Sequence, residues 1–212
     1  MMATNQGPEG TARAQGTDPA PETDPAGLLP PGKRQLHLTG FMGSGKSTVG
    51  RRLARLLDWD FIDLDQAIAE RAGKSVAGIF ADEGEEVFRA LEDQLLLEIS
   101  VLATTHAAGR GVIVALGGGT LLDPDNQEVC AAIATIVWLQ CPVEILRERC
   151  AEGTGTRPLW GSTEELEQRL AEREPGYRGA DFTVDASGSP DEVAETVLAI
   201  LGGQGRAPDP RH

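Results

Sequence analysis

A short stretch between positions 40 and 47 has the residue types and the spacing of a phosphate-binding loop, the P-loop. Gly40, Gly45, Lys46 and Ser47 fit the pattern G-x-x-x-x-G-K-[ST]. Glycines let backbone N–H groups approach an oxyanion, the lysine reaches the β- and γ-phosphates of a nucleotide, and the serine hydroxyl ligates Mg²⁺. The stretch therefore predicts a site for a nucleoside triphosphate and Mg²⁺. The expected nucleotide contacts are Gly43, Ser44, Gly45, Lys46, Ser47 and Thr48.

The segments on both sides of this loop favour the same interpretation. Leu36 and Leu38 lie in an apolar run typical of a strand, and apolar residues recur at helical spacing after the loop. The helical stripe consists of Val49, Leu53, Leu56 and Leu57. A helix that begins inside the motif points the positive end of its dipole at the phosphate. The alternative is a glycine turn that only precedes an ordinary helix.

Two aspartates lie where the second predicted strand meets the next helix. Asp63 ends the strand, residues 59–63, and Asp65 begins the helix. Asp63 and Asp65 would point to the same side of an extended backbone, although a helix starting at Asp65 could rotate that side chain. One carboxylate can serve Mg²⁺, directly or through water, and the other can accept hydrogen bonds from substrate hydroxyls. The alternative for Asp65 is that it only caps its helix.

Two glycine-rich segments could complete such a site. Gly117 to Gly119 follow a strand of buried type, and they form either a flexible turn or a surface that a ring can approach closely. Arg157 lies in the second segment, residues 153–161, after the fourth strand and its helix. A mobile lid at this place would carry a cation over a transferred phosphoryl group.

A longer helix is predicted by apolar residues that lie four positions apart for most of its length. They are Val87, Leu91, Leu95, Ile99 and Leu102. Arg89 stands beside Phe88, one position off this stripe. An arginine in that position usually lies on the solvated surface, so the residues alone favour a surface role for Arg89.

Short apolar strands alternate with helices along the chain. They are expected at residues 36–38, 59–63, 112–115, 135–139 and 182–184. This alternation favours an α/β fold in which a parallel sheet is covered on both faces. Ligands of such folds lie beyond the carboxyl ends of the strands. Because the P-loop, Asp63 and Gly117 directly follow strands, we expect them to converge on one crevice.

The composition predicts one domain with loose ends. The chain has 212 residues, of which 40% are hydrophobic, which suits a single core. Residues 1–32 and 203–212 contain few large apolar side chains, so we expect a disordered extension and a disordered tail around a domain at 33–202.

Charge and cysteine content restrict the partners and the compartment. A net charge of −14 argues against binding to nucleic acid or to an anionic membrane surface. Cys130, Cys141 and Cys150 are odd in number and lie in apolar contexts, which is typical of reduced thiols. Neither a secretion signal nor a membrane anchor is predicted, so we expect a cytoplasmic protein.

Together the motifs resemble those of the shikimate kinase family. The matching stretches are GFMGSGKS (40–47), FIDLD (61–65), GEEVFRALE (84–92), LGGG (116–119), TRPL (156–159) and REPGY (173–177). They follow the order and rough spacing of that family over about residues 35–200. The P-loop alone indicates only nucleotide binding, and the downstream stretches narrow the resemblance to this family.

The resemblance implies a fold and a reaction. The fold is a P-loop NTPase fold of the nucleoside-monophosphate-kinase type, with a five-stranded parallel sheet flanked by helices, a substrate-binding helical segment and a lid over about residues 153–162. The reaction is ATP-dependent phosphorylation of the 3-hydroxyl of shikimate, with Mg²⁺ as the cofactor. ATP and shikimate are the expected partners, and the expected state is a monomer.

The resemblance also assigns roles to individual residues. Lys46, Asp63 and Arg157 are expected to be catalytic, with Ser47 and Asp63 on the metal. The acceptor-binding set is Asp65, Arg89, Gly117, Gly118, Gly119 and Arg173, in which the two arginines hold the carboxylate. Arg157 would contact phosphate, and Arg149 would lie on the adenine side. Because that alignment of Arg149 needs a one-residue adjustment, a surface helix position remains the alternative for it.

Two other functions remain open from the residues. One is a P-loop kinase for another small polyol acid such as gluconate, and the other is a nucleotide-binding regulator without an acceptor. The paired arginines and the glycine run argue against the first. Release of ADP that depends on an acceptor distinguishes both from a shikimate kinase.

Overall fold

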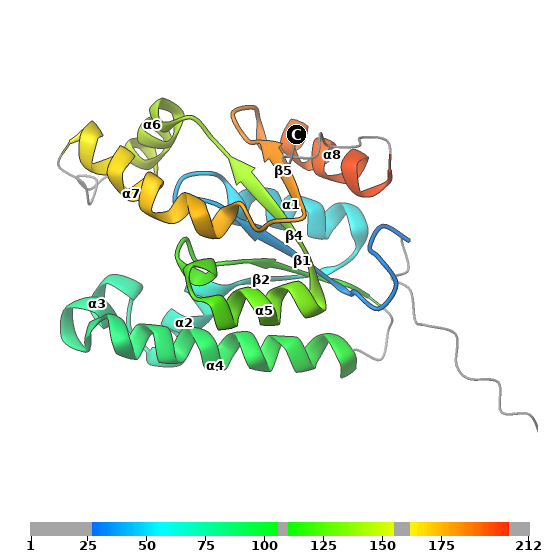
Figure 1. Cartoon of the computed structure of the whole chain (residues 1–212), viewed down its shortest axis with the longest axis horizontal. Coiled ribbons are helices and arrows are strands. Elements are labelled where there is room, and N and C mark those ends of the chain that lie inside the picture. Colours follow the sequence, from blue (N-terminus) through cyan, green and yellow to red (C-terminus); the bar gives the residue numbers. More distant parts are fainter. Residues whose placement is uncertain (1–26, 106–109, 155–161, 204–212) are drawn as a thin grey trace, which may run out of the picture.

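The computed structural model describes residues 27–105, 110–154 and 162–203. Five strands form one sheet in the order β2-β3-β1-β4-β5, and all neighbouring strands are parallel (Figure 1). They are β1 (Gln35–Thr39), β2 (Asp60–Asp63), β3 (Val112–Ala115), β4 (Ala134–Gln140) and β5 (Phe182–Asp185). All five strands predicted from the sequence are confirmed, and their ends differ by no more than one residue.

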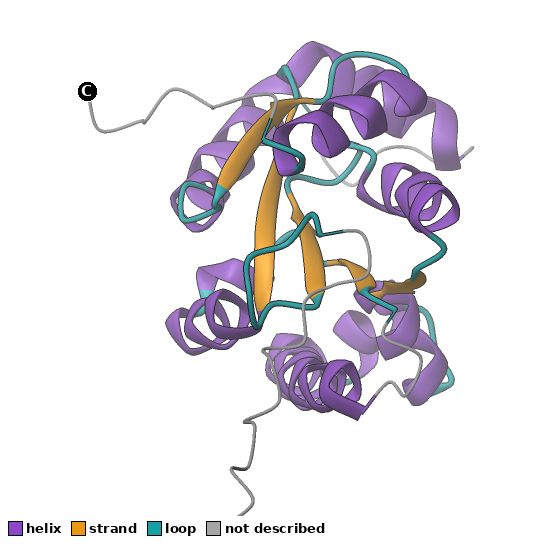
Figure 2. Cartoon of the chain, turned by 90° about the vertical axis from the view of Figure 1, so that its right-hand side faces the viewer, coloured by secondary structure: helices purple, strands orange, loops and turns teal. Residues whose placement is uncertain are grey.

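Helices cover both faces of the sheet, which lies between two helical layers (Figure 2). One layer contains α1 (Lys46–Leu57), α6 (Val143–Thr154), α7 (Thr163–Tyr177) and α8 (Pro190–Leu201). The other contains α2 (Leu64–Ala72), α3 (Val76–Asp82), α4 (Gly84–Thr105), the short 3₁₀ helix η1 (Thr120–Leu122) and α5 (Pro124–Ile133). Among the described residues no helix is both long and apolar enough to cross a membrane.

The two layers have separate apolar cores. Alternate side chains of a strand point to opposite faces of a sheet, so Ile113 packs with α1 and α8 whereas Val112 and Val114 pack with α4. All four residues of β3 are buried. The continuous apolar run of β3 is thus explained by burial on both faces.

The packed part of the chain begins earlier than the domain boundary expected at residue 33. Leu29 is only 5% exposed and belongs to the core on the α1 side. The pair Leu28 and Leu29, in an otherwise polar and Pro/Gly-rich segment, was too weak a compositional signal to reveal this contact in advance.

The buried face of α4 differs from the predicted stripe. Leu95 and Ile99 are buried as expected, but Val87 is 38% exposed and Phe88 is buried in its place. The buried face also includes Glu92, which is fully inaccessible to solvent. At the amino end of the helix, the predicted stripe is one position off, at Val87 in place of Phe88. Apolar spacing alone did not predict that Glu92, a carboxylate, would be on the buried face.

Candidate active site

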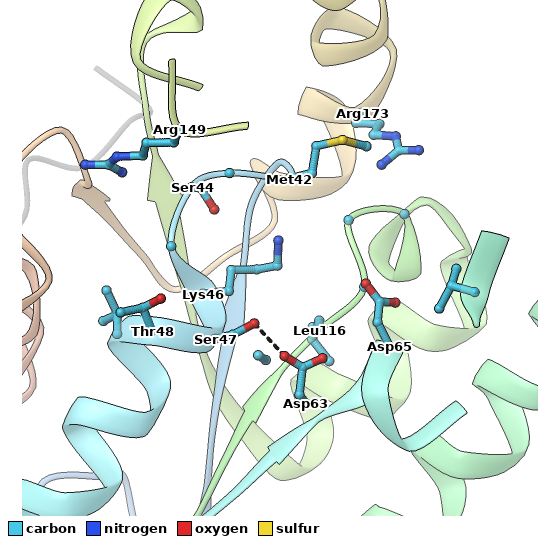
Figure 3. A pocket seen from close by; sticks show the side chains of 18 of the residues that line it. Met42, Ser44, Lys46, Ser47, Thr48, Asp63, Asp65, Leu116, Arg149 and Arg173 are labelled. Atoms are coloured by element: carbon cyan, nitrogen blue, oxygen red, sulfur yellow. Dashed lines mark hydrogen bonds between the residues drawn. The ribbon is translucent and has the colours of Figure 1, made fainter. Parts of the chain in front are cut away.

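The residues predicted to do chemistry meet at the carboxyl edge of the sheet. The P-loop follows β1, Asp63 ends β2, and the glycine turn, Gly117 to Gly119, comes after β3. They line one crevice of about 1360 Å³ (Figure 3). Every candidate residue within the described part of the chain borders it, whereas Arg157 and most of the predicted lid lie outside the described residues.

The P-loop needs its glycines for close packing. Gly40, Gly43 and Gly45 all have positive φ angles, which side chains with a Cβ rarely adopt. A Cβ on Gly40 would also lie 2.6 Å from the carbonyl oxygen of Leu139. Gly45 is the N-cap of α1 and provides no side-chain cap, so the first N–H groups of the helix remain available to an anion.

Lys46 lies in the floor of this loop. Its Nζ donates hydrogen bonds to the carbonyl oxygens of Gly40, at 2.8 Å, and Phe41, at 3.1 Å. Burial lowers the pKa of Lys46 to about 8, and the nearby carboxylates of Asp65 and Asp63 partly oppose that shift. The ammonium group is therefore only weakly compensated, which suits a site that receives phosphate oxygens.

Ser47 and Asp63 bring two oxygen ligands together. The Ser47 hydroxyl donates to Asp63 Oδ2 at 2.5 Å (Figure 3). A hydroxyl and a carboxylate at the edge of a phosphate-binding loop form the hard oxygen donor set that Mg²⁺ prefers. These two residues thus fit a bound Mg²⁺.

Asp63 and Asp65 have different structural roles. Asp63 is the N-cap of α2, and its Oδ1 accepts a hydrogen bond from the backbone N–H of Gln66. The capping alternative considered for Asp65 is therefore wrong. Asp65 lies in the first turn of α2, and its carboxylate has no hydrogen-bond partner among the described residues. Burial raises the pKa of its carboxyl, and Lys46 opposes that rise.

Arg89 faces the crevice, and the surface position favoured by the residues alone is wrong. Its Nη1 donates to Glu92 Oε2 at 2.6 Å, and its Nη2 donates to Glu85 Oε1 at 3.0 Å. Thr120 Oγ1 donates to the other oxygen of Glu92, at 2.5 Å. Burial raises the pKa of Glu92, while its hydrogen bonds to Thr120 and Arg89 lower it.

Glu92 is a site residue that reasoning from the sequence missed. Its carboxylate holds the guanidinium of Arg89 through their ion pair. It also lies against the glycine turn, since a Cβ on Gly117 would be 2.7 Å from its Oε1. The signal was present in the sequence, because Glu92 follows Phe88 by four positions and so shares its helix face.

Arg173 reaches the crevice from α7. Its guanidinium lies 5.5 Å from the centre of the Phe41 ring, which belongs to the P-loop. Unlike Arg89, it has no ion-pair partner among the described residues. Within the described part of the chain, its charge is therefore available to an anionic ligand.

Arg149 stands on the opposite side of the P-loop from Arg173 (Figure 3). It donates hydrogen bonds to the carbonyl oxygens of Ala186, Ser187 and Gly188, at 2.8, 3.0 and 2.9 Å. These bonds hold the loop between β5 and α8, which also lines the crevice. The alternative of a plain surface helix residue is thus wrong for Arg149.

Comparisons with known proteins agree with this geometry. The sequence model of the family described as shikimate kinase matches residues 42–202. The shikimate kinase of Gloeobacter violaceus is 42% identical over 169 residues, which cover 78% of this chain and 91% of that protein. The shikimate kinase of Halorhodospira halophila is also 42% identical, over 80% of this chain and 94% of the relative.

Solved structures give the same result. The shikimate kinase of Acinetobacter baumannii in complex with shikimate has a TM-score of 0.70 and 32% identity, over 81% of this chain and 94% of that chain. A gluconokinase of Sinorhizobium meliloti has a TM-score of 0.54 at 18% identity, over 82% of this chain and 94% of that chain. The second similarity shows only the shared fold. The family model matches most of the chain, and two relatives are 42% identical to it. The chain therefore belongs to the shikimate kinase family.

Proposed function

We propose that this crevice binds ATP on the P-loop and shikimate between α2, α4 and α7, and transfers the γ-phosphoryl group between them. Family membership supplies the reaction, in which shikimate is phosphorylated on its 3-hydroxyl to give 3-phosphoshikimate and ADP. This reaction is a step of chorismate and aromatic amino acid biosynthesis. The observation that carries the assignment is one crevice in which a P-loop faces Asp65, Arg89 and Arg173.

The nucleotide side consists of the P-loop and the Arg149 side of the crevice. The uncapped first turn of α1 and Lys46 bind the phosphates, while Thr48 and Arg149 border the more distant part of the nucleotide. Ser47 and Asp63 would hold Mg²⁺, and the ion would supply positive charge that neutralises the phosphates. Arg149 supports this side through the loop carbonyls that it holds.

The acceptor side matches the chemistry of shikimate, a ring with a carboxylate and several hydroxyls. Asp65 accepts hydrogen bonds from hydroxyls, and Arg89 and Arg173 bind the carboxylate. The glycine turn lets the ring approach the backbone. Glu92 keeps the Arg89 fork in place, so less conformational entropy is lost when the carboxylate binds.

The chemical step relies on positioning and charge. A phosphoryl group in a loose transition state needs little covalent help from protein. Lys46 stabilises the oxygens of the transferring group, and Asp63 accepts the proton of the attacking hydroxyl late in the step. Arg157, on the lid, adds a second cation over the same oxygens.

The remaining proposals concern the setting of the enzyme. We infer a cytoplasmic monomer whose partners are ATP and shikimate, without nucleic acid or membrane. A net charge of −14 and three free cysteines support this.

A coupled assay of ADP release tests the proposed function. It compares shikimate, gluconate and no acceptor, and we expect release that depends on shikimate. Release with gluconate alone would identify a kinase for another polyol acid. Nucleotide binding without any stimulated release would instead indicate a regulator.

Nucleotide binding should depend on pH through Lys46. Its pKa of about 8 in the free protein must rise when phosphates surround it, so binding takes up a proton. Affinity for MgATP should therefore fall above about pH 8, by up to about tenfold per pH unit. Calorimetry in buffers of different ionisation enthalpy measures the uptake. Lys46→Arg should abolish it, and persistent uptake in that variant would assign the titration to another group.

A further inference from the structure

The three glycines of the turn each lie against a different group of the acceptor site. A Cβ on Gly117 would be 3.0 Å from Asp65 Oδ1, one on Gly118 would be 2.8 Å from Arg173 Nη1, and one on Gly119 would be 2.8 Å from Arg89 Nη2. All three distances are shorter than ordinary van der Waals contact. The position of this turn therefore determines how the three recognition groups are spaced.

Tyr177 makes a hydrogen bond to the middle of this turn. Its hydroxyl donates to the carbonyl oxygen of Gly118 at 2.5 Å. The side chain is 1% exposed, and its ring packs against Trp138 with 5.8 Å between ring centres. Because the Tyr177 ring is buried and packed, its hydroxyl has a fixed position and in turn fixes the carbonyl group of Gly118.

The same helix face carries Arg173. Arg173 and Tyr177 lie four residues apart on α7, so both side chains point to one side of the helix. Burial raises the pKa of Tyr177 to about 12, although the nearby Arg173 cation lowers it. Both side chains lie against Gly118, since a Cβ on that residue would be 2.8 Å from Arg173 Nη1 and 3.7 Å from the Tyr177 hydroxyl oxygen.

A second contact holds this end of α7 against the turn. A Cβ on Gly176 would lie 2.5 Å from the carbonyl oxygen of Leu121 in η1. The close backbone approach at Gly176 fixes the separation of α7 and η1, and the Tyr177 hydroxyl fixes the register between them.

We propose that Tyr177 is a positioning residue for the acceptor: its hydroxyl holds Gly118 and Arg173 in the arrangement that receives the acceptor carboxylate. The proposal rests on the proposed function of the crevice. Tyr177 does not touch the reacting atoms, and it acts through Gly118 and Arg173.

Tyr177→Phe tests this role because it removes the hydroxyl and keeps the ring against Trp138. We expect the KM and the calorimetric Kd for shikimate to rise about fivefold to tenfold, as for the loss of one buried hydrogen bond. The KM for ATP and kcat should stay within about twofold. Arg178→Gln is the matched control, since Arg178 is the next residue and its side chain is 69% exposed.

The outcomes separate the possible failures. No shikimate turnover by the wild-type chain would overturn both the proposed function and the role of Tyr177. Normal turnover with an unchanged shikimate KM in Tyr177→Phe would overturn the role of Tyr177 alone. Equal losses in both KM values and kcat, with a lower melting temperature, would show a merely structural residue.

A spectroscopic test avoids the variant altogether. Tyr177 is the only tyrosine of the chain, so ¹³C labelling at tyrosine Cζ gives one resonance from the intact protein. We expect shikimate to shift this resonance and ADP alone to leave it nearly unchanged. An unshifted resonance under shikimate saturation, with binding verified by calorimetry, would contradict the proposal.

Discussion

Lys46→Ala should lower kcat by about 10² to 10³, the usual effect of removing one preorganised group that stabilises charge in a transition state. The fold should persist, because Lys46 is the first residue of α1 and, among the described residues, its Nζ donates hydrogen bonds to loop carbonyls and takes no part in the apolar core. Steady-state kinetics and the thermal melt together measure the two properties.

Lys74→Ala is the control for this substitution. Lys74 forms ion pairs with Asp82 and Glu83 at the surface, and such pairs contribute little to stability. Its loss should leave kcat unchanged. A folded Lys46→Ala variant with nearly normal turnover would be incompatible with the assigned role of the P-loop.

Arg173→Gln should raise the Kd for shikimate by about 30-fold or more, as expected when one partner of a desolvated charge pair is lost. Arg173 has no carboxylate partner among the described residues, so its charge is available to the ligand. Affinity for MgATP should remain, because the proposed phosphate site is the uncapped first turn of α1, whereas Arg173 reaches the crevice from α7 on the acceptor side. Separate calorimetric titrations with shikimate and with nucleotide measure both affinities.

Arg169→Gln is the matched control for Arg173. Arg169 lies one helical turn earlier on α7 and also borders the crevice, but it is exposed. Solvent and salt screen its charge, so we expect less than about a twofold effect. If both variants lower the affinity for shikimate equally, the acceptor is bound by the general positive charge of α7 and not by a specific contact with Arg173. Equal loss of both ligands in Arg173→Gln would indicate misfolding.

Local patterns predicted much of the structure. Short apolar runs located all five strands. The three central strands, β1, β3 and β4, are almost entirely buried, which leaves a continuous apolar signal, whereas the edge strands β2 and β5 are only partly buried. The glycines of the P-loop were also predictable from the sequence motif, since their positive φ angles and close backbone contacts exclude a side chain. The burial of Leu29 was not predicted, because two adjacent leucines in a polar segment show no periodicity.

The same limit explains the errors on α4. Its apolar spacing is nearly continuous around the helix, so a choice between Val87 and Phe88 depends on where the sheet lies. Glu92 entered the buried face only because Arg89 and Thr120 compensate its charge there. A buried carboxylate is stable only with such partners. Arg89 precedes Glu92 by three residues on α4, but Thr120 comes from another part of the chain.

The sequence by itself determined the strand order along the chain, the phosphate-binding loop and the motifs of the shikimate kinase family, because each depends on residues close together in the chain. Only the tertiary structure decided that Asp63 caps α2 and that Tyr177 bonds to Gly118. It also decided that Arg89 has ion-pair partners whereas Arg173 has none among the described residues. Tyr177 and Gly118 are 59 positions apart. Contacts of this kind follow from how α7 docks on the glycine turn, and no local pattern of residues encodes that docking.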